Sequence, residues 1–322
     1  MLLFSLNPDA QSMMTGLVVR LRAWFGVDGL NIRMPDRKIK EKLNVSVIGA
    51  GRLGIVLARA LNAQGYHIKS LVARRLRNAR KAAALLDDKP KTFAASQIRF
   101  LPQADLFLIC VPDDQIASVA IELSKLRLDG EPLAFHTSGA LSSDVLSLLK
   151  EQGWSVGSLH PLISVSGPDA PINGAFWCVE GDRKAMRSGK ALVKALGGTS
   201  FSIPSAEKPL YHAAAVMTSG NVVALFDVAL EMLVQSGLTR NLARQILQPL
   251  LASTVRSLET KDPAQALTGT FSRGDVETVK RHLAALKDHK LTDALEAYRL
   301  LGKRSLKLTK DHPHITRILK SV

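Results

Sequence analysis

Between residue 44 and about residue 204, short apolar runs alternate with segments in which apolar residues recur at helical spacing. The run NVSVIGAG is rich in β-branched residues and ends in glycine, which is typical of a buried parallel strand. The next segment, RLGIVLARALNAQG, has apolar residues three and four positions apart and stops at Gly65, which indicates a helix with a C-terminal glycine. This alternation predicts an α/β fold built on an open, doubly wound parallel sheet.

The same alternation continues to residue 204. Two further helices are expected over Ala79–Leu86 and 184–196. The remaining predicted strands are YHIKSLVAR (66–74), DLFLICVP (105–112), PLAFHTSGA (132–140), WSVGSLHP (154–161), AFWCVEGD (175–182) and TSFSIP (199–204).

From residue 206 onward the pattern becomes wholly helical. The segment KPLYHAAAVMTSGNVVALFDVALEMLVQSG predicts one long, almost wholly apolar helix that ends at Gly237. Helices are expected to follow at about 239–258, 276–287 and 291–310, with no strand among them. A helix that is apolar all round is buried in a bundle or in a dimer interface. We therefore expect a Rossmann domain over 41–205 and a helical domain for substrate binding and dimerisation over 206–322.

Residues 1–40 are expected to form an extension outside the fold. Their sequence lacks the small-residue cleavage site of a secretory signal, and translation starting at Met34 is an alternative to Met1. No stretch reaches the ~18 uninterrupted apolar residues that a membrane span needs. The nearest candidate, 213–234, is interrupted by polar residues, so we expect no membrane partner.

The formal net charge of +15 suits phosphorylated ligands, nucleic acid or an anionic surface without choosing among them. The basic residues are scattered, as on a solvated face, and no nucleic-acid-binding motif accompanies them, so no nucleic-acid partner is expected. Cys110 and Cys178 lie far apart in strand-like runs, which favours a reduced, cytoplasmic protein. No His-x-x-x-His or Cys-x-x-Cys spacing indicates a metal site.

The strand–turn–helix sequence VIGAGRLG, residues 47–54, predicts a dinucleotide-binding loop. Gly49 would permit the tight turn, Gly51 would let backbone amides approach a pyrophosphate, and Gly54 would let helix and strand pack closely. The helix that begins beside Arg52 would point its N-terminal amides at the phosphates. The residues expected to contact the cofactor here are Gly49, Ala50, Gly51, Arg52, Leu53 and Gly54.

The end of the second strand indicates which dinucleotide binds. An NAD site has an acidic residue about 20 positions past the glycines, whereas this strand ends in LVARRLR. Arg74 and Arg75 stand where a 2′-phosphate would lie, and arginine offers a fixed fork of donors to phosphate. The sequence therefore favours NADP, the alternative being that both arginines are merely solvated. Val111 and Pro112 are expected to contact the cofactor, while Asp113 and Asp114 are better placed to cap the next helix.

The motifs VIGAGRLG, CVPDDQI, FHTSGALSSDVL, SLHPL, YHAAAVMTSGNVVAL and ALTGTFSRGDVETVKRHL occur in this order. In this combination the chain, from about 44 to 310, resembles proteins that join a Rossmann-like NADP-binding domain to a C-terminal domain of unassigned function. That family is similar in architecture to pyrroline-5-carboxylate reductases, 6-phosphogluconate and β-hydroxyacid dehydrogenases, ketopantoate reductases and deazaflavin-dependent NADP reductases.

The resemblance implies an all-α second domain like that of 6-phosphogluconate dehydrogenase, a homodimer built through that domain and an active site between the domains. It does not bring a substrate. The dehydrogenase relatives carry a catalytic lysine on the first long helix of the second domain, whereas here that helix opens with YHAAAV and Lys208 lies before it. The lysine mechanism is therefore not carried over.

Two catalytic candidates lie where predicted strands end, at the carboxyl edge of the sheet, where ligands of open α/β folds bind. Ser138 could hold a substrate oxygen, or its turn could cap a helix over 141–149. His160 in SLHPL is our first choice as proton donor or substrate ligand, the alternative being a core histidine bonded to backbone.

Three further candidates lie in the helical domain. His212 opens the long helix as a catalytic candidate, and Asn221 lies about opposite it if that helix is regular, so the two cannot share one cleft. Arg273 could reach an anionic substrate or a cofactor phosphate, whereas Asp275 is placed to cap the helix that follows. Asn221 and Arg273 are thus candidates for substrate binding.

These features together predict an NADP-dependent oxidoreductase that transfers a hydride to or from a small, anionic oxo- or imino-compound. Two alternatives remain open. One is hydride exchange with a deazaflavin, which needs no substrate acid, and the other is a non-catalytic protein that senses NADP or only assembles with a partner.

Overall fold

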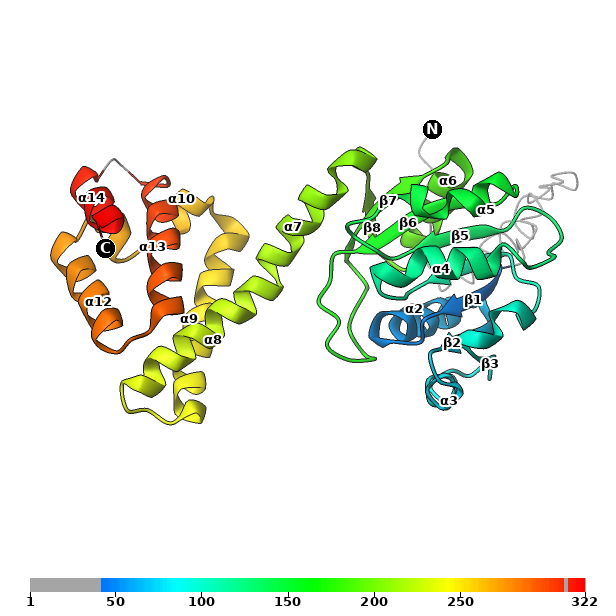
Figure 1. Ribbon diagram of the computed structural model, residues 1–322, viewed down its shortest axis with the longest axis horizontal. Coiled ribbons are helices and arrows are strands. Elements are labelled where there is room, and N and C mark those ends of the chain that lie inside the picture. Colours follow the sequence, from blue (N-terminus) through cyan, green and yellow to red (C-terminus); the bar gives the residue numbers. More distant parts are fainter. Residues whose placement is uncertain (1–41, 310–311, 322) are drawn as a thin grey trace, which may run out of the picture. The chain divides into compact units, whose positions relative to one another are not determined.

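The computed structural model describes residues 42–309 and 312–321. Its eight strands form one sheet in the order β3-β2-β1-β4-β5-β6-β7-β8 (Figure 1). The strands are β1 (Asn44–Ile48), β2 (His67–Ala73), β3 (Lys91–Ala94), β4 (Leu106–Ile109), β5 (Leu133–His136), β6 (Ser155–Pro161), β7 (Phe176–Gly181) and β8 (Thr199–Phe201). All seven predicted strands are present, and β3 was not predicted because KTFA is short and begins with an exposed lysine.

The sheet is parallel except at one place, where β6 and β7 pair in antiparallel register. A parallel pair needs a crossover connection, usually a helix, and the link 162–175 between these two strands contains none. The expectation of a wholly parallel sheet is therefore wrong at this pair, and it is confirmed for every other pair.

Helices cover both faces of the sheet, as a doubly wound fold requires. They are α2 (Arg52–Ala63), α3 (Leu76–Ala83), α4 (Asp113–Leu123), α5 (Ser147–Glu151) and α6 (Arg183–Ala195), with the short 3₁₀ helices η1 (Ala95–Phe100), η2 (Ser143–Leu146) and η3 (Ser205–Glu207). Alternate residues of one strand enter different cores: Leu108 packs with α2 and α6, while Phe107 and Ile109 pack with α4 and α5.

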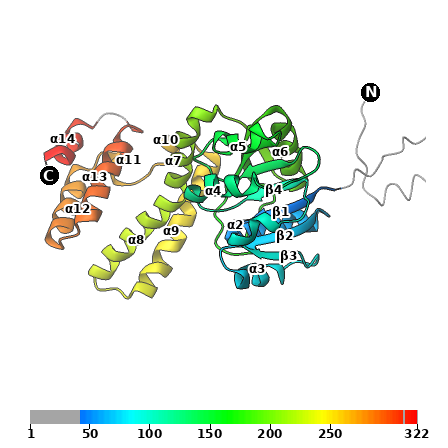
Figure 2. The ribbon, with the colours of Figure 1, turned by 45° about the vertical axis from the view of Figure 1, so that its right-hand side comes forward.

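Beyond β8 the described residues are helical. The helices are α7 (Lys208–Thr218), α8 (Gly220–Gln235), α9 (Arg240–Thr260), α10 (Pro263–Ala266), α11 (Thr270–Arg273), α12 (Val276–Asp288), α13 (Thr292–Leu306) and α14 (Pro313–Ser321). Helices α12, α13 and α14 lie together (Figure 2). They pack around the buried side chains of Val279, Leu283 and Ile315. The predicted single long helix is interrupted at Ser219, whose backbone departs from helical geometry (φ −114°, ψ −78°).

The segment Ser205–Gln235 is long and apolar enough to cross a membrane. An 18-residue stretch within it has a mean hydropathy of 1.6, and only 6% of that stretch is buried. The expectation from the sequence, that no segment qualifies, counted only uninterrupted apolar runs and did not average over the polar positions. Large apolar side chains are exposed along this segment and the next helix, among them Leu210, Met217, Val223, Ile246 and Leu250. An exposed apolar surface of this kind marks an interaction site.

The core of the sheet domain makes a direct prediction about stability. Phe107 is fully buried and its ring lies 5.0 Å from that of Trp154. Phe107→Ala should lower the free energy of unfolding by about 3–5 kcal/mol, because the lost contacts leave a cavity that closes only in part. Urea unfolding followed by circular dichroism measures this change.

Phe100→Ala is the matched control, because Phe100 is 60% exposed on the same domain. Its effect should stay below about 1 kcal/mol. Equal losses in the two variants would show that the ring of Phe107 does not hold this core together.

Candidate functional site

The turn between β1 and α2 is shaped by glycines that leave no room for side chains. Gly49 has φ +104°, and a Cβ there would lie 2.3 Å from the carbonyl oxygen of Cys110. A Cβ on Gly54 would lie 2.0 Å from the carbonyl oxygen of Gly49. Gly51 differs, since a Cβ there would meet nothing within 4 Å. The backbone at the start of α2 therefore faces open space, which is the geometry that lets a phosphate approach its amides.

Neighbouring strand ends frame this turn. Arg74 and Arg75 follow β2 directly, and both are exposed. Among the described residues neither arginine forms an ion pair with a carboxylate. Val111 and Pro112 follow β4 on the other side of β1, and Val111 is half-buried against the core. The backbone of the turn is fixed from β2, because the amides of Gly49 and Ala50 both donate to the carbonyl of Val72 at 2.9 Å.

The two aspartates after Pro112 do not cap α4 as the sequence suggested, because the N-cap position is Pro112 and both acids lie in the first helical turn. There Asp113 accepts a 2.8 Å hydrogen bond from the hydroxyl of Ser138. That hydroxyl also accepts from the amides of Ala140 and Leu141 at 3.1 and 3.0 Å. Ser138 is buried, and the one proton of its hydroxyl is donated to Asp113. This hydroxyl therefore closes the turn after β5 and has no proton left for a substrate.

The predicted helix over 141–149 is replaced by η2 and α5, and Ser142 caps it in place of Ser138. The core histidine bonded to backbone that was weighed for His160 occurs instead at His136. That side chain is fully buried, its Nε2 lies 3.1 Å from the carbonyl of Ser142, and its Nδ1 accepts from the amide of Ser138 at 3.2 Å. Burial is the main cause that lowers the pKa of His136 to about 4.

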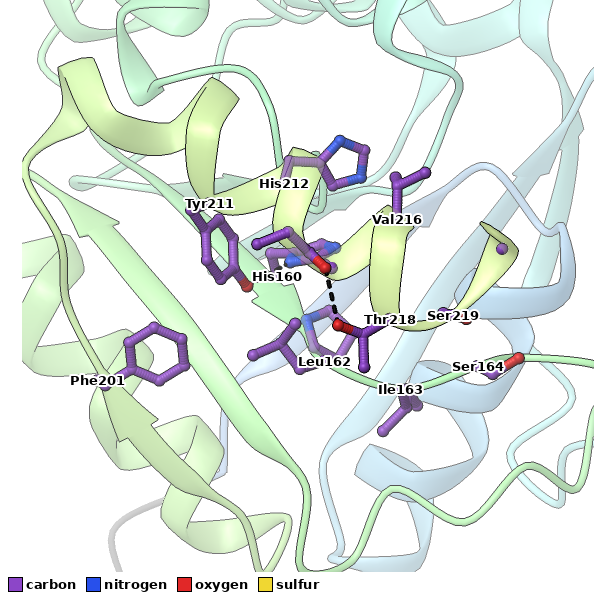
Figure 3. Close-up of a pocket in the computed structure, with 14 residues that line it drawn as sticks. His160, Leu162, Ile163, Ser164, Phe201, Tyr211, His212, Val216, Thr218 and Ser219 are labelled. Atoms are coloured by element: carbon purple, nitrogen blue, oxygen red, sulfur yellow. Dashed lines mark hydrogen bonds between the residues drawn. The ribbon is translucent and has the colours of Figure 1, made fainter. Parts of the chain in front are cut away.

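A cleft of about 760 Å³ lies between the end of β6 and helix α7 (Figure 3). One end is polar, with His160 from β6 and Tyr211 and His212 from α7. Its walls are mostly apolar, and Leu162, Ile163, Phe201 and Val216 contribute to them. Ser164, Thr218 and Ser219 add hydroxyl groups at the far side, where Thr218 already donates to the carbonyl of Ala214 at 2.9 Å.

His160 is held by two neighbouring rings. Its Nδ1 lies 2.7 Å from the hydroxyl of Tyr211, and its ring meets that of His212 edge-on, with centroids 5.6 Å apart. Gly139 lies against both imidazoles, because a Cβ there would be 2.5 Å from Cδ2 of His212 and 2.8 Å from Nε2 of His160. The sequence showed His160 and His212 as candidates, whereas Tyr211 and Gly139 were missed.

His160 is neutral near pH 7. Burial lowers its pKa to about 4, and the nearby His212 and Lys208 act in the same direction. Burial also raises the pKa of Tyr211, so this phenol keeps its proton. When Tyr211 donates to Nδ1, the ring proton of His160 sits on Nε2, the nitrogen next to Gly139. The pair therefore offers a neutral hydrogen-bond donor, not an imidazolium acid.

Lys208 was given no role in the sequence analysis. It begins α7, one helical turn before His212, and is fully buried. Its Nζ donates to the hydroxyl of Ser158 at 2.6 Å and to the carbonyl of Ser138 at 3.3 Å. Burial lowers the pKa of this amine. Lys208 does not line the cleft, and its bonds tie the start of α7 to the turn that carries Gly139.

Neither of the two remaining candidates lines this cleft. Asn221 is exposed on α8, and the break at Ser219 removes the regular helix on which its placement relied. Arg273 ends α11, which packs against α12 and α13, and it does not line the cleft. Asp275 caps α12 as predicted, accepting from the amide of Thr278 at 3.0 Å. The anionic substrate expected from the sequence finds no support here, because the residues that line the cleft include no lysine or arginine.

No group of three His, Cys, Asp or Glu side chains that could hold a metal ion occurs in 42–309 or 312–321. The two cysteines are free. Burial raises the pKa of the Cys110 thiol to about 12, so it is not a nucleophile at neutral pH.

Comparison with solved structures shows the same fold in several proteins. A Bacteroides fragilis protein described as an NADP oxidoreductase is 23% identical, with a TM-score of 0.70, and the match covers 83% of this chain and 99% of that one. A Thermotoga maritima protein is 24% identical with a TM-score of 0.64, over 83% and 98% of the two chains. A reductive aminase from Aspergillus terreus, in complex with NADPH and ethyl levulinate, is 14% identical with a TM-score of 0.61, over 86% and 99%. No curated protein is significantly similar in sequence.

Two family models match successive parts of the chain. Residues 33–161 match a Rossmann-like domain, and residues 175–305 match a domain of unknown function, DUF2520. These matches agree with the resemblance that the ordered motifs indicated. The chain thus carries a match to a Rossmann-like domain followed by a match to a DUF2520 domain.

Proposed function

We propose that the protein is an NADP-dependent reductase of a small oxo- or imino-compound. The observation that carries this proposal is the turn at Gly49–Gly54. Its backbone packs too closely for side chains at Gly49 and Gly54, while the space next to Gly51 is open. Two exposed arginines, Arg74 and Arg75, follow the neighbouring strand β2. An open Gly51 at the start of α2 leaves room for a phosphate next to the first amides of that helix. When bound, NADPH supplies a hydride for a carbonyl or imine carbon.

The residues around the turn divide the work of holding the dinucleotide. The first amides of α2 would receive the pyrophosphate, since a helix N-terminus attracts anions. Arg74 and Arg75 would bind the 2′-phosphate that distinguishes NADP from NAD. Val111 and Pro112, at the end of β4, would contact the part of the cofactor that extends from the turn after β1 toward the turn after β5.

The chemistry would take place where Gly139 meets His160. Nε2 of His160 would donate a hydrogen bond to the carbonyl oxygen or imine nitrogen of the substrate, with Tyr211 fixing the ring through Nδ1. The ring of His212, which meets that of His160 edge-on beside Gly139, would help to hold His160 in place. A polar end of this kind inside an apolar cleft favours an enzyme over a protein that only senses NADP.

We also propose that the protein is a cytoplasmic homodimer. The apolar faces of α7, α8 and α9 are exposed in the single chain, and a second copy would cover them without exposing the polar positions to lipid. The two free cysteines and the use of NADP agree with the cytoplasm.

Light scattering should give a mass of about twice 34.9 kDa. Leu250→Glu on α9 should halve this mass, because it places a charge on the apolar face. Leu85→Glu, an exposed leucine of the sheet domain, should leave the mass unchanged. A monomeric wild type that sediments with lipid vesicles would instead assign the apolar faces to a membrane.

Selectivity for the extra phosphate is tested by replacing both Arg74 and Arg75 with alanine. The Kd for NADPH, measured by its fluorescence, should rise by about tenfold or more, because charge-assisted hydrogen bonds to the 2′-phosphate are lost. The Kd for NADH should change by less than about threefold. Arg183 and Arg187, exposed on α6, provide the matched double-alanine control for the general loss of two positive charges. If wild type binds NADH as tightly as NADPH, the assignment of these arginines is wrong.

The role of Tyr211 is tested by Tyr211→Phe, with NADPH oxidation measured over a panel of ketones and cyclic imines. The kcat should fall by about tenfold or more because Nδ1 of His160 loses its partner, while the Kd for NADPH stays unchanged. Tyr298→Phe is the matched control, since Tyr298 makes the same contact with Nδ1 of His282, at 2.8 Å, in the helical domain. Turnover of the Tyr211 variant at the wild-type rate would remove the His160–Tyr211 pair from the mechanism.

A further inference from the structure

We infer that the cleft between β6 and α7 takes an uncharged, largely apolar ketone or imine and discriminates against substrates that carry a carboxylate. This inference rests on the proposed function, because it names the substrate class of that same site. It departs from the anionic substrate that the sequence led us to expect.

The lining of the cleft carries the argument. No lysine, arginine, aspartate or glutamate is among the residues that surround its roughly 760 Å³. A bound carboxylate would therefore lack a lysine or arginine to pair with, and a bound ammonium group would lack a carboxylate. The walls are formed largely by Leu162, Ile163, Phe201 and Val216, which favour hydrocarbon.

The polar end of the cleft supplies neutral hydrogen-bonding groups. His160 and Tyr211 contact each other at 2.7 Å, so together they keep one ring nitrogen, Nε2, for a ligand. Charging His160 to make it a partner for a carboxylate is unfavourable at neutral pH, because burial holds its pKa at about 4, and the nearby His212 and Lys208 act in the same direction. A carbonyl oxygen or imine nitrogen can accept a hydrogen bond from this Nε2.

The positive charges of the sheet domain lie elsewhere. Lys208 is fully buried, and its amine is directed to Ser138 and Ser158, not into the cleft. Arg59 forms an ion pair with Asp169. Arg74 and Arg75 stand at the end of β2, where the proposed function assigns them to the cofactor. The high net charge is thus not available to a substrate in this cleft.

An anion that enters such a cleft loses water and gains no charged partner, which costs it affinity relative to a neutral molecule of the same shape. Ethyl levulinate and levulinate form a matched pair, since they share a ketone and differ in an ester or a carboxylate. Ethyl 5-oxohexanoate and 5-oxohexanoate form a second pair one methylene longer.

The experiment measures binding of each ligand to the full chain saturated with NADP⁺, by isothermal titration, so that no turnover is needed. Each ester should bind at least about tenfold more tightly than its acid. Equal affinity, tighter binding of the acid, or no binding of either member of a pair would overturn the inference. Rates of NADPH oxidation are measured separately, and an absence of any turnover with a retained ester preference would contradict the proposed function alone.

A charge placed in the cleft provides the internal check. Leu162→Lys should reverse or abolish the ester preference, because it gives the carboxylate a partner. Leu148→Lys is the control, since Leu148 on α5 is 37% exposed like Leu162 but lies outside the cleft. An identical ester preference in wild type and the Leu162 variant would show that these ligands bind somewhere else.

Discussion

Backbone packs directly against backbone where the first turn of the sheet domain meets the end of β4. Gly49 adopts a left-handed conformation because the carbonyl of Cys110 occupies the space that a side chain would need, and Gly54 presses against the carbonyl of Gly49 in turn. This contact sets the direction of α2 and the position of its first amides. The open Gly51, the arginines after β2 and the segment Val111–Pro112 are arranged around it, so the cofactor assignment depends on it.

A second close contact connects the sheet domain to the chemistry. Gly139 has no side chain, and the rings of His160 and His212 fill the space beside it. The amine of Lys208 donates to the carbonyl of Ser138, and the hydroxyl of Ser138 donates to Asp113. The turn after β5 is thus fixed by α4 and by the start of α7 at once. Rigid support of this kind is what a catalytic constellation needs, because small displacements of reacting groups are costly.

The sequence predicted those parts of the structure that follow from local pattern. Strand–helix alternation gave the seven main strands, and the spacing of Gly49, Gly51 and Gly54 gave the shape of the turn. The antiparallel β7 could have been inferred from the link 162–175, which lacks the helical periodicity that a crossover needs. The break at Ser219 could also have been inferred, because it falls in the run Thr218–Asn221, where a Ser-Gly pair interrupts the apolar pattern.

The site was less accessible to sequence reasoning because its contacts join distant segments. His160 and His212 were recognised as chemically capable, but only the fold brings them together beside Gly139. Tyr211 was overlooked beside His212, and Lys208 was set aside although its spacing of four from His212 places both on one helical face. Ser138 was predicted as a catalytic residue and Asp113 as a helix cap, whereas in the structure the hydroxyl of Ser138 donates a hydrogen bond to Asp113. Net charge says nothing about which side chains line a given cleft, so it could not indicate the substrate.

The central claim is that the amides at the start of α2 receive the diphosphate of NADPH. Fluorescence titration of NADPH into Gly51→Val and Gly167→Val tests it most directly, because a Cβ meets nothing within 4 Å at either glycine and both variants should fold. The account predicts that Gly51→Val weakens NADPH binding by about a hundredfold, roughly the loss of two charge-assisted hydrogen bonds, while Gly167→Val binds as wild type does. Undiminished binding in a folded Gly51→Val variant would contradict it.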